Sequence, residues 1–132
     1  MIVKKSPINQ WFPAFDIVNL FTMYRDKEYV FLDIETTGFA PGNSQLYLIG
    51  CLNFSENSWS KTQWLAETFD EEERILQNFL NFLPKNFCLI TFNGTTFDLP
   101  YLQQKIRQFG LESVSPDLDF FDLYKVYLQL SK

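Results

Sequence analysis

The chain contains, at residues 29–38, the run Tyr29-Val30-Phe31-Leu32-Asp33-Ile34-Glu35-Thr36-Thr37-Gly38. Bulky apolar residues that end at a turn signal are typical of a buried β-strand. Because side chains alternate between the two faces of a strand, Asp33 and Glu35 are predicted to point the same way. Neighbouring carboxylates repel each other unless a proton or a cation lies between them, and Mg²⁺ and Mn²⁺ prefer oxygen ligands of this kind. The alternative is a strand that ends in a solvated acidic turn.

Length and composition predict one globular domain. The chain has 132 residues, of which 46% are hydrophobic, and it has no histidine, which excludes histidine-based catalysis and the common zinc sites. The net charge of −5 argues against a broad basic surface for nucleic-acid backbone, although carboxylates that bind cations would present a positive site to a phosphate. With neither a membrane-length apolar run nor a signal-peptide core, we expect a cytoplasmic protein that contacts no membrane. Cys51 and Cys88 are predicted to be buried free thiols.

The order of the predicted elements is that of an α/β domain with a mixed sheet. The predicted strands lie at 29–38, 45–54, 59–65, 86–92 and 120–121. The predicted helices lie at 14–25, 70–83, 99–109 and 122–130. The acidic run at residues 70–73 is assigned to a helix start, with Asp70 as its cap, because acidic side chains oppose the positive end of the helix dipole. Lys105 and Arg107 are expected to be solvated.

A second informative stretch lies at residues 90–102, where a strand, a tight turn and a helix follow one another. Asn93 and Gly94 form the predicted turn, and Asp98 falls in the first turn of the helix. A helix N-terminus favours a negative side chain and holds it in one place. Asp98 is therefore either an ordinary helix cap or a functional carboxylate, and the stretch alone leaves both interpretations open.

Taken together, the two stretches resemble the DEDD superfamily of 3′–5′ exonucleases, which share the ribonuclease H-like fold. The family's Asp-x-Glu motif is matched by Asp33 and Glu35, and its second motif by Asn93, Phe97 and Asp98. The amino-acid sequence of residues 92–102 is most similar to that of the YprB-type ribonuclease H-like branch. The resemblance implies a mixed five-stranded sheet flanked by helices, with an exonuclease domain at 29–132. Residues 1–28 are expected to form an N-terminal leader with the short helix at 14–25, which the spacing of its apolar residues predicts.

The resemblance also implies a site. In that family, carboxylates hold two divalent cations, Mg²⁺ or Mn²⁺, that activate a water and stabilise the departing 3′ oxygen of a phosphodiester. Carried over by position, the metal ligands and catalytic residues are Asp33, Glu35 and Asp98. The substrate, a nucleic acid with a single-stranded 3′ end, would contact Thr36, Thr37, Asn93 and Phe97. The sequence favours neither DNA nor RNA.

One part of the family pattern is missing from these residues. The family carries a fourth carboxylate and a His or Tyr on a helix after the fifth strand, whereas Asp122 matches its helix-capping Asp. The chain is therefore expected to end before the last motif helix, with the domain incomplete at its C-terminus. Two alternatives stay open. One is a catalytically degenerate or truncated homologue that acts as a nucleic-acid-binding or structural module, and the other is an unrelated α/β protein whose acids are caps and turns.

Overall fold

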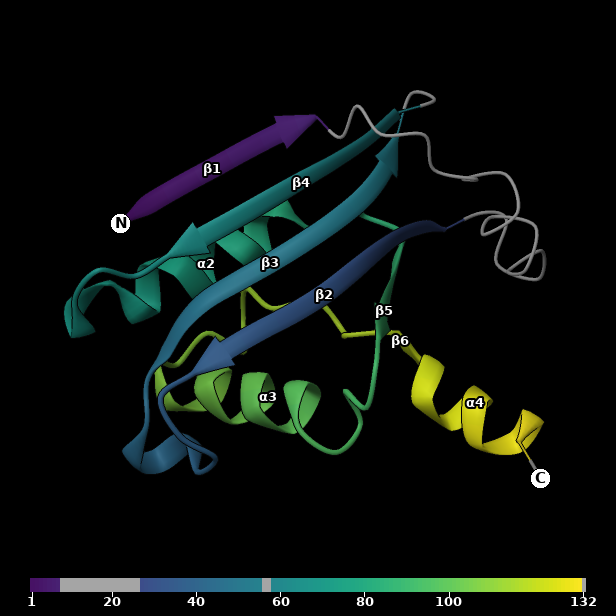
Figure 1. The fold of residues 1–132 in the computed structure, drawn as a ribbon. Helices are drawn as coiled ribbons and strands as arrows, with labels where there is room; N and C mark the ends of the chain where they lie inside the picture. The colour runs from purple at the N-terminus through teal and green to yellow at the C-terminus, as the bar shows by residue number, and fades with distance from the viewer. Residues whose placement is uncertain (8–26, 56–57, 132) are drawn as a thin grey trace.

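In the part of the chain that the structure describes, a six-stranded mixed sheet with two α-helices packed on one face forms the body of the protein (Figure 1). The computed structural model describes residues 1–7, 27–55 and 58–131. The strands are β1 Ile2–Pro7, β2 Glu28–Thr36, β3 Leu46–Ser55, β4 Ser58–Leu65, β5 Phe87–Thr91 and β6 Phe120–Asp122. The helices are α2 Glu72–Phe82, α3 Asp98–Gln108 and α4 Leu123–Leu130, with short 3-10 turns η2 Pro41–Asn43 and η3 Phe69–Glu71.

The strand order is β1-β4-β3-β2-β5-β6, so β2 lies inside the sheet. The first four strands in this order pair antiparallel, and β2–β5 and β5–β6 pair parallel. Parallel neighbours need crossover connections, which α2 supplies before β5 and α3 supplies before β6. This arrangement confirms the predicted α/β class with a mixed sheet.

The core lies between the sheet and the pair α2 and α3. Along β2, Val30, Leu32 and Ile34 are buried in this core, whereas Asp33 and Glu35 are exposed. The predicted alternation of β2 is therefore confirmed. The helices contribute apolar stripes, and Trp64 of β4 packs edge-on against Phe79 of α2 at 6.1 Å between ring centroids. Cys51 and Cys88 are buried free thiols, as expected.

The sheet has one strand more than the five predicted. Residues 2–7, within the expected leader, pair antiparallel with β4, from Ile2 opposite Leu65 to Pro7 opposite Ser60. Most side chains of β1 are exposed, so the strand is held through its backbone and leaves no buried apolar pattern in the sequence. The helix predicted at 14–25 lies outside the described residues.

The predicted cap of α2 is also wrong. Asp70 lies inside η3, and the helix begins at Glu72 after Glu71, whose side chain makes no capping hydrogen bond. The physical reason is that the Glu72 carboxylate turns into the core, where it has partners from β3 and α3.

In the described ranges no helix has the length and apolarity to cross a bilayer, since even α2 and α3 have 11 residues each.

Candidate functional site

The side chains of Asp33 and Glu35 line a pocket of about 580 Å³ on the sheet face opposite the core. In the register of the sheet, Asp33 lies opposite Gly50 of β3, and Gly50 lies opposite Gln63 of β4. A Cβ built on Gly50 would have the Asp33 carbonyl oxygen, at 3.8 Å, as its nearest neighbour. The glycine therefore leaves the floor of the pocket open beside Asp33.

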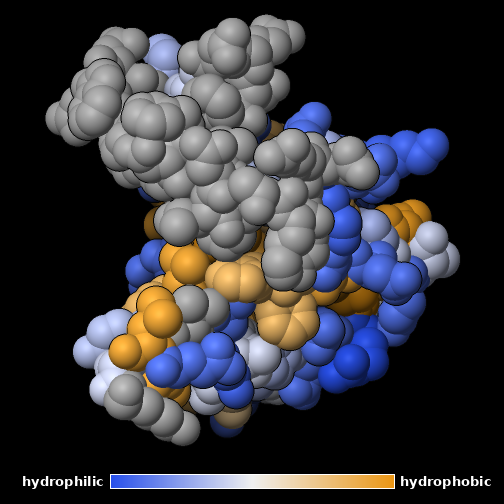
Figure 2. Space-filling model, turned by 90° about the vertical axis from the view of Figure 1, so that its right-hand side faces the viewer, coloured by the Kyte–Doolittle hydropathy of each residue, from blue (hydrophilic) through white to orange (hydrophobic). Residues whose placement is uncertain are grey.

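The walls of the pocket are mostly apolar. Phe92 contributes a ring that is 65% exposed and lies 5.3 Å from the ring of Tyr124 on α4. Seen from the side of α4, apolar surface gathers between hydrophilic residues (Figure 2). The remaining lining residues include one cation, Lys61, with these apolar residues: Phe31, Leu32, Leu48, Cys51, Leu52, Ile90 and Leu123.

Asp98 is the first residue of α3, and only 9% of its surface is exposed. Burial, together with the negative charges of Asp33, Asp122 and Glu35, raises the pKa of its carboxyl to about 6, although a hydrogen bond with its own backbone opposes the increase. Among the described residues, no lysine or arginine forms an ion pair with Asp98. The two motifs are therefore coupled electrostatically, and the coupling is one of repulsion.

Asp98 is not the cap of its helix. The residue before α3 is Phe97, and no side chain there makes a capping hydrogen bond. Of the two interpretations that the sequence left open for Asp98, the ordinary helix cap does not describe its position. Asp98 instead lies one residue further on, inside the first turn of α3.

The turn before α3 has a backbone that only certain residues can adopt. Asn93 has a φ of 62°, a left-handed conformation that asparagine tolerates better than most residues. A Cβ on Gly94 would come within 2.3 Å of the Thr91 hydroxyl oxygen, so glycine is required at this position. The turn closes with a hydrogen bond of 2.8 Å from the Leu99 N–H to the Gly94 carbonyl oxygen.

Asp122 holds this turn in place. Its carboxylate accepts from the Asn93 N–H at 2.7 Å, from the Thr95 N–H at 3.3 Å and from the Thr95 hydroxyl. It also accepts from the Tyr124 N–H at 3.0 Å, which is the predicted cap of α4. Burial alone would raise the pKa of Asp122, but these hydrogen bonds outweigh it and lower the pKa. Nothing in the sequence pattern predicted the second role, in which Asp122 ties β6 to the turn that delivers Asp98.

The predicted substrate-binding threonines lie where β2 runs into the loop of residues 37–45, which we call the 37–45 loop. The Thr36 hydroxyl donates to the Gly38 carbonyl oxygen at 2.7 Å, and the Thr37 hydroxyl oxygen accepts from the Gln45 N–H at 2.8 Å. Both hydroxyls thus shape the loop, and neither residue lines the pocket. Phe97, half-buried, packs on Phe39 of the loop at 6.2 Å, which brings the second motif against the loop after the first.

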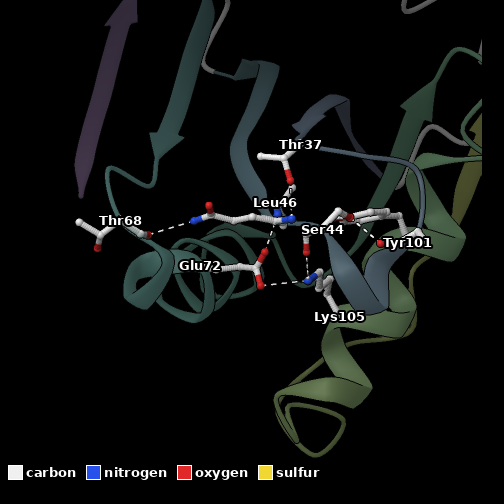
Figure 3. A network of polar contacts seen from close by, with 9 residues as sticks. Thr37, Ser44, Leu46, Thr68, Glu72, Tyr101 and Lys105 are labelled. Atoms are coloured by element: carbon white, nitrogen blue, oxygen red, sulfur yellow. Dashed lines mark hydrogen bonds and ion pairs between the residues drawn. The ribbon is translucent and has the colours of Figure 1, made fainter.

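A buried ion pair next to this loop contradicts one expectation (Figure 3). Lys105, expected to be solvated, is 1% exposed, and its Nζ lies 3.0 Å from Glu72 Oε1. Helical spacing could have shown it, because Lys105 follows buried Tyr101 by four residues and Leu102 by three. Glu72 likewise precedes Ile75 and Leu76 on the buried stripe of α2.

The predicted metal ligands fit a divalent cation by their chemistry. Asp33, Glu35 and Asp98 offer only oxygen atoms, and their mutual repulsion is what a cation relieves. Within the part of the chain that the structure describes, however, no three carboxylate or cysteine side chains are gathered tightly enough to share one ion. Asp33 and Glu35 face the pocket together, and Asp98 lies among the buried residues at the start of α3.

A mixed sheet of this strand order, with carboxylates at the end of an inner strand and at the start of a crossover helix, has the architecture of a ribonuclease H-like domain. The sequence matches the RNase_H superfamily over residues 30–132, and the chain belongs to that family. The predicted resemblance to ribonuclease H-like proteins is thereby confirmed. No protein of curated function matches the sequence.

Solved structures show the same fold at low sequence identity. A family B DNA polymerase from the hyperthermophilic archaeon Pyrobaculum calidifontis superposes with a TM-score of 0.60 at 16% identity, over 74% of this chain and 15% of that chain. The zinc-bound complex of Escherichia coli ExoI with single-stranded DNA gives a TM-score of 0.56 at 17% identity, over 76% and 29%. An apo exonuclease I gives 0.56 at 17% identity, over 76% and 30%. The chain thus spans less than a third of each of these proteins.

Proposed function

We propose that the protein is a metal-dependent nuclease that removes nucleotides from the 3′ end of a nucleic acid in the cytoplasm. The observation that carries the proposal is the coupling of three carboxylates across two motifs. Asp33 and Glu35 face an open pocket, and their charges help to raise the pKa of the buried Asp98. Membership of the RNase_H superfamily supports the same reaction class.

Asp33, Glu35 and Asp98 would hold two divalent cations, Mg²⁺ or Mn²⁺. When bound, such cations lower the pKa of a water and neutralise charge on the departing oxygen of a phosphodiester. The chain's own residues bind and orient the substrate beside them. Phe92 offers an exposed ring on which a base can stack, and Asn93 and Phe97 set the turn that holds Asp98.

The substrate that we propose is a single-stranded 3′ end. The net charge of −5, and a pocket in which Lys61 is the one cation among the described lining residues, suit contact with one strand end better than binding along a long duplex backbone. One structural neighbour is an exonuclease complex with single-stranded DNA, which supports the proposal. Thr36 and Thr37, at the start of the 37–45 loop, would lie along the terminal nucleotide.

A second candidate function rests on a different observation. The described residues gather no three carboxylates around one point, and the sequence has no histidine to position a water. These features favour a catalytically degenerate or truncated homologue that binds nucleic acid, or supports a partner, without cutting. The two candidates differ in turnover and share the same pocket.

Manganese binding, measured by calorimetry, tests the carboxylate site directly. We expect the wild-type protein to bind Mn²⁺ and the Asp33→Ala variant to lose at least tenfold in affinity, because the variant removes one of a few oxygen ligands. The control is Asp117→Asn, which neutralises an exposed carboxylate outside the pocket. Equal affinities of wild type and Asp33→Ala would refute the metal site.

A further inference from the structure

A buried ion pair that joins α2 to α3 also bonds the backbone of the 37–45 loop (Figure 3). The Lys105 ammonium donates to Glu72 Oε1 at 3.0 Å and to the Ser44 carbonyl oxygen at 2.7 Å. Its Nζ also lies 5.7 Å and 5.9 Å from the ring centroids of Tyr101 and Phe109. The lysine is thus enclosed by acceptors and aromatic faces, and one of those acceptors is the backbone of the loop.

The other carboxylate oxygen of Glu72 bonds the backbone just after the 37–45 loop. It accepts the N–H of Leu46, the first residue of β3. The register between β2 and β3 shifts at this place, because Glu35 lies opposite Leu48 while Thr36 lies opposite Leu46. A shift of this kind is a β-bulge, which re-aims the side chains next to it. Glu72 therefore bonds the amide that borders the bulge beside Glu35.

Further hydrogen bonds tie the loop to its surroundings. The Ser44 hydroxyl lies 2.8 Å from the Tyr101 hydroxyl, and Gln45 Nε2 donates to the Thr68 carbonyl oxygen at 3.0 Å. The main chain of Gln45 bonds Thr37 in both directions, through the Thr37 hydroxyl oxygen and the Thr37 N–H. The bonds between Thr37 and Gln45 hold the two ends of the loop together. The bonds to Tyr101 and Thr68 then attach the loop to α3 and to the segment before α2.

Stability alone does not explain why charges occupy these positions. Desolvation offsets most of the attraction in a buried ion pair, and apolar residues of similar volume are often as stable or more so. An apolar pair would continue the buried sides of α2 and α3, which include Ile75, Leu76 and Leu102. It could not bond the Ser44 carbonyl or the Leu46 amide. What the charged pair adds is therefore the attachment of the loop and of the bulge.

We propose that Lys105 and Glu72 are positioning residues of the candidate site, which fix the 37–45 loop and the bulge so that Glu35 and Thr36 keep their places beside the pocket. This inference rests on the proposed function of Asp33, Glu35 and Asp98. Neither residue lines the pocket, so they act through the backbone that they hold.

Two double variants separate this role from packing. Lys105→Met with Glu72→Gln removes both charges but leaves an amide oxygen that can accept the Leu46 N–H. Lys105→Met with Glu72→Leu removes both charges and the acceptor. We expect hydrogen exchange of the Leu46 amide to be roughly tenfold faster in the leucine variant than in the glutamine variant, since a bond to a buried amide contributes about that factor.

The second readout is binding of an unlabelled oligothymidylate in the presence of Mn²⁺. The leucine variant is expected to lose roughly tenfold in affinity, and the glutamine variant, which lacks only the Lys105 bonds, to lose a few-fold. Wild-type affinity in the glutamine variant would overturn the role of Lys105. Equal exchange at Leu46 in the two variants would overturn the inference, and so would faster exchange with unchanged oligonucleotide affinity. Failure of the metal site itself would show separately, as Mn²⁺ affinity that does not respond to Asp33→Ala.

Tyr101→Phe keeps the test decisive if the leucine variant does not fold. It removes one hydroxyl, the partner of Ser44, and leaves the ring and the ion pair unchanged. We expect a few-fold faster exchange of the Gln45 amide and weaker oligonucleotide binding. Wild-type values for both would contradict the positioning role of the network.

Discussion

Asp98 is a carboxylate whose surroundings disfavour its charge. It is buried at the start of α3, and burial together with Asp33, Asp122 and Glu35 raises its pKa to about 6. A helix N-terminus would favour the charged form, so desolvation and like charges outweigh the helix dipole at this residue. Electrostatic repulsion between neighbouring carboxylates is typical of sites that bind a cation or share a proton.

The raised pKa of Asp98 predicts a defined dependence of stability on pH. The folded protein binds a proton on Asp98 near pH 6 and the unfolded chain only near its ordinary value of 3.8, so folding gains stability as the pH falls from about 6 to about 4. Asp98→Asn mimics the protonated form. Without metal, we expect it to be more stable than wild type by roughly 1–3 kcal/mol at pH 7.5 and nearly equal at pH 4, measured by urea unfolding. A difference that does not change with pH would contradict this assignment.

Two glycines in the site give opposite predictions. Gly94→Ala would place a Cβ 2.3 Å from the Thr91 hydroxyl oxygen, and we expect a loss of roughly 2–3 kcal/mol in the free energy of unfolding. Gly50→Ala meets nothing closer than 3.8 Å and is expected to leave stability unchanged or raised by up to about 1 kcal/mol. Thermal unfolding of both variants checks the pair. Similar losses in both would mean that the floor beside Asp33 is packed.

At the level of elements, the turn before α3 and the start of α4 share one carboxylate. Asp122 accepts from Asn93 and Thr95 in the turn and from Tyr124 in the helix. Asp122→Ala should therefore cost roughly 2–4 kcal/mol, more than the loss of a single helix cap, because partly buried donors in two elements lose their partner. Asp122→Asn keeps an acceptor oxygen and should cost less. Chemical unfolding compares the two, and a loss of about 1 kcal/mol for Asp122→Ala would indicate a cap alone.

The sequence predicted most elements well, and β6 and α4 fall within one residue of the predicted ranges because Asp122 caps α4 where a cap was expected. The longer elements share a buried face. The predictions for β2, β3, β4 and β5, and for α2 and α3, agree with the structure to within a few residues, because their apolar positions repeat at the strand or helix period. β1 left no such signal, since its side chains are mostly exposed and its pairing is through the backbone. The start of α2 was misplaced because a tertiary partner, Lys105, draws Glu72 inward.

For the whole molecule, the sequence predicted the fold better than the site. Two short motifs in the right order of strands and helices were enough for the ribonuclease H-like class, which the RNase_H superfamily match confirms. The arrangement of Asp33, Glu35 and Asp98 depends on how the 37–45 loop and the turn before α3 are held. The hydrogen bonds that hold these two segments come from Lys105, Glu72 and Asp122. These three residues are distant in the sequence from the segments that they bond.

The measurement that tests the proposed nuclease most directly is strand shortening. An oligonucleotide labelled at its 5′ end is incubated with the protein and Mg²⁺ or Mn²⁺, in parallel with the variants Asp33→Asn and Asp117→Asn. We predict a ladder of products shortened from the 3′ end, unchanged with Asp117→Asn and at least 100-fold slower with Asp33→Asn or with chelator present. Shortening at the same rate in wild type and Asp33→Asn, or none in wild type, would contradict the proposed function.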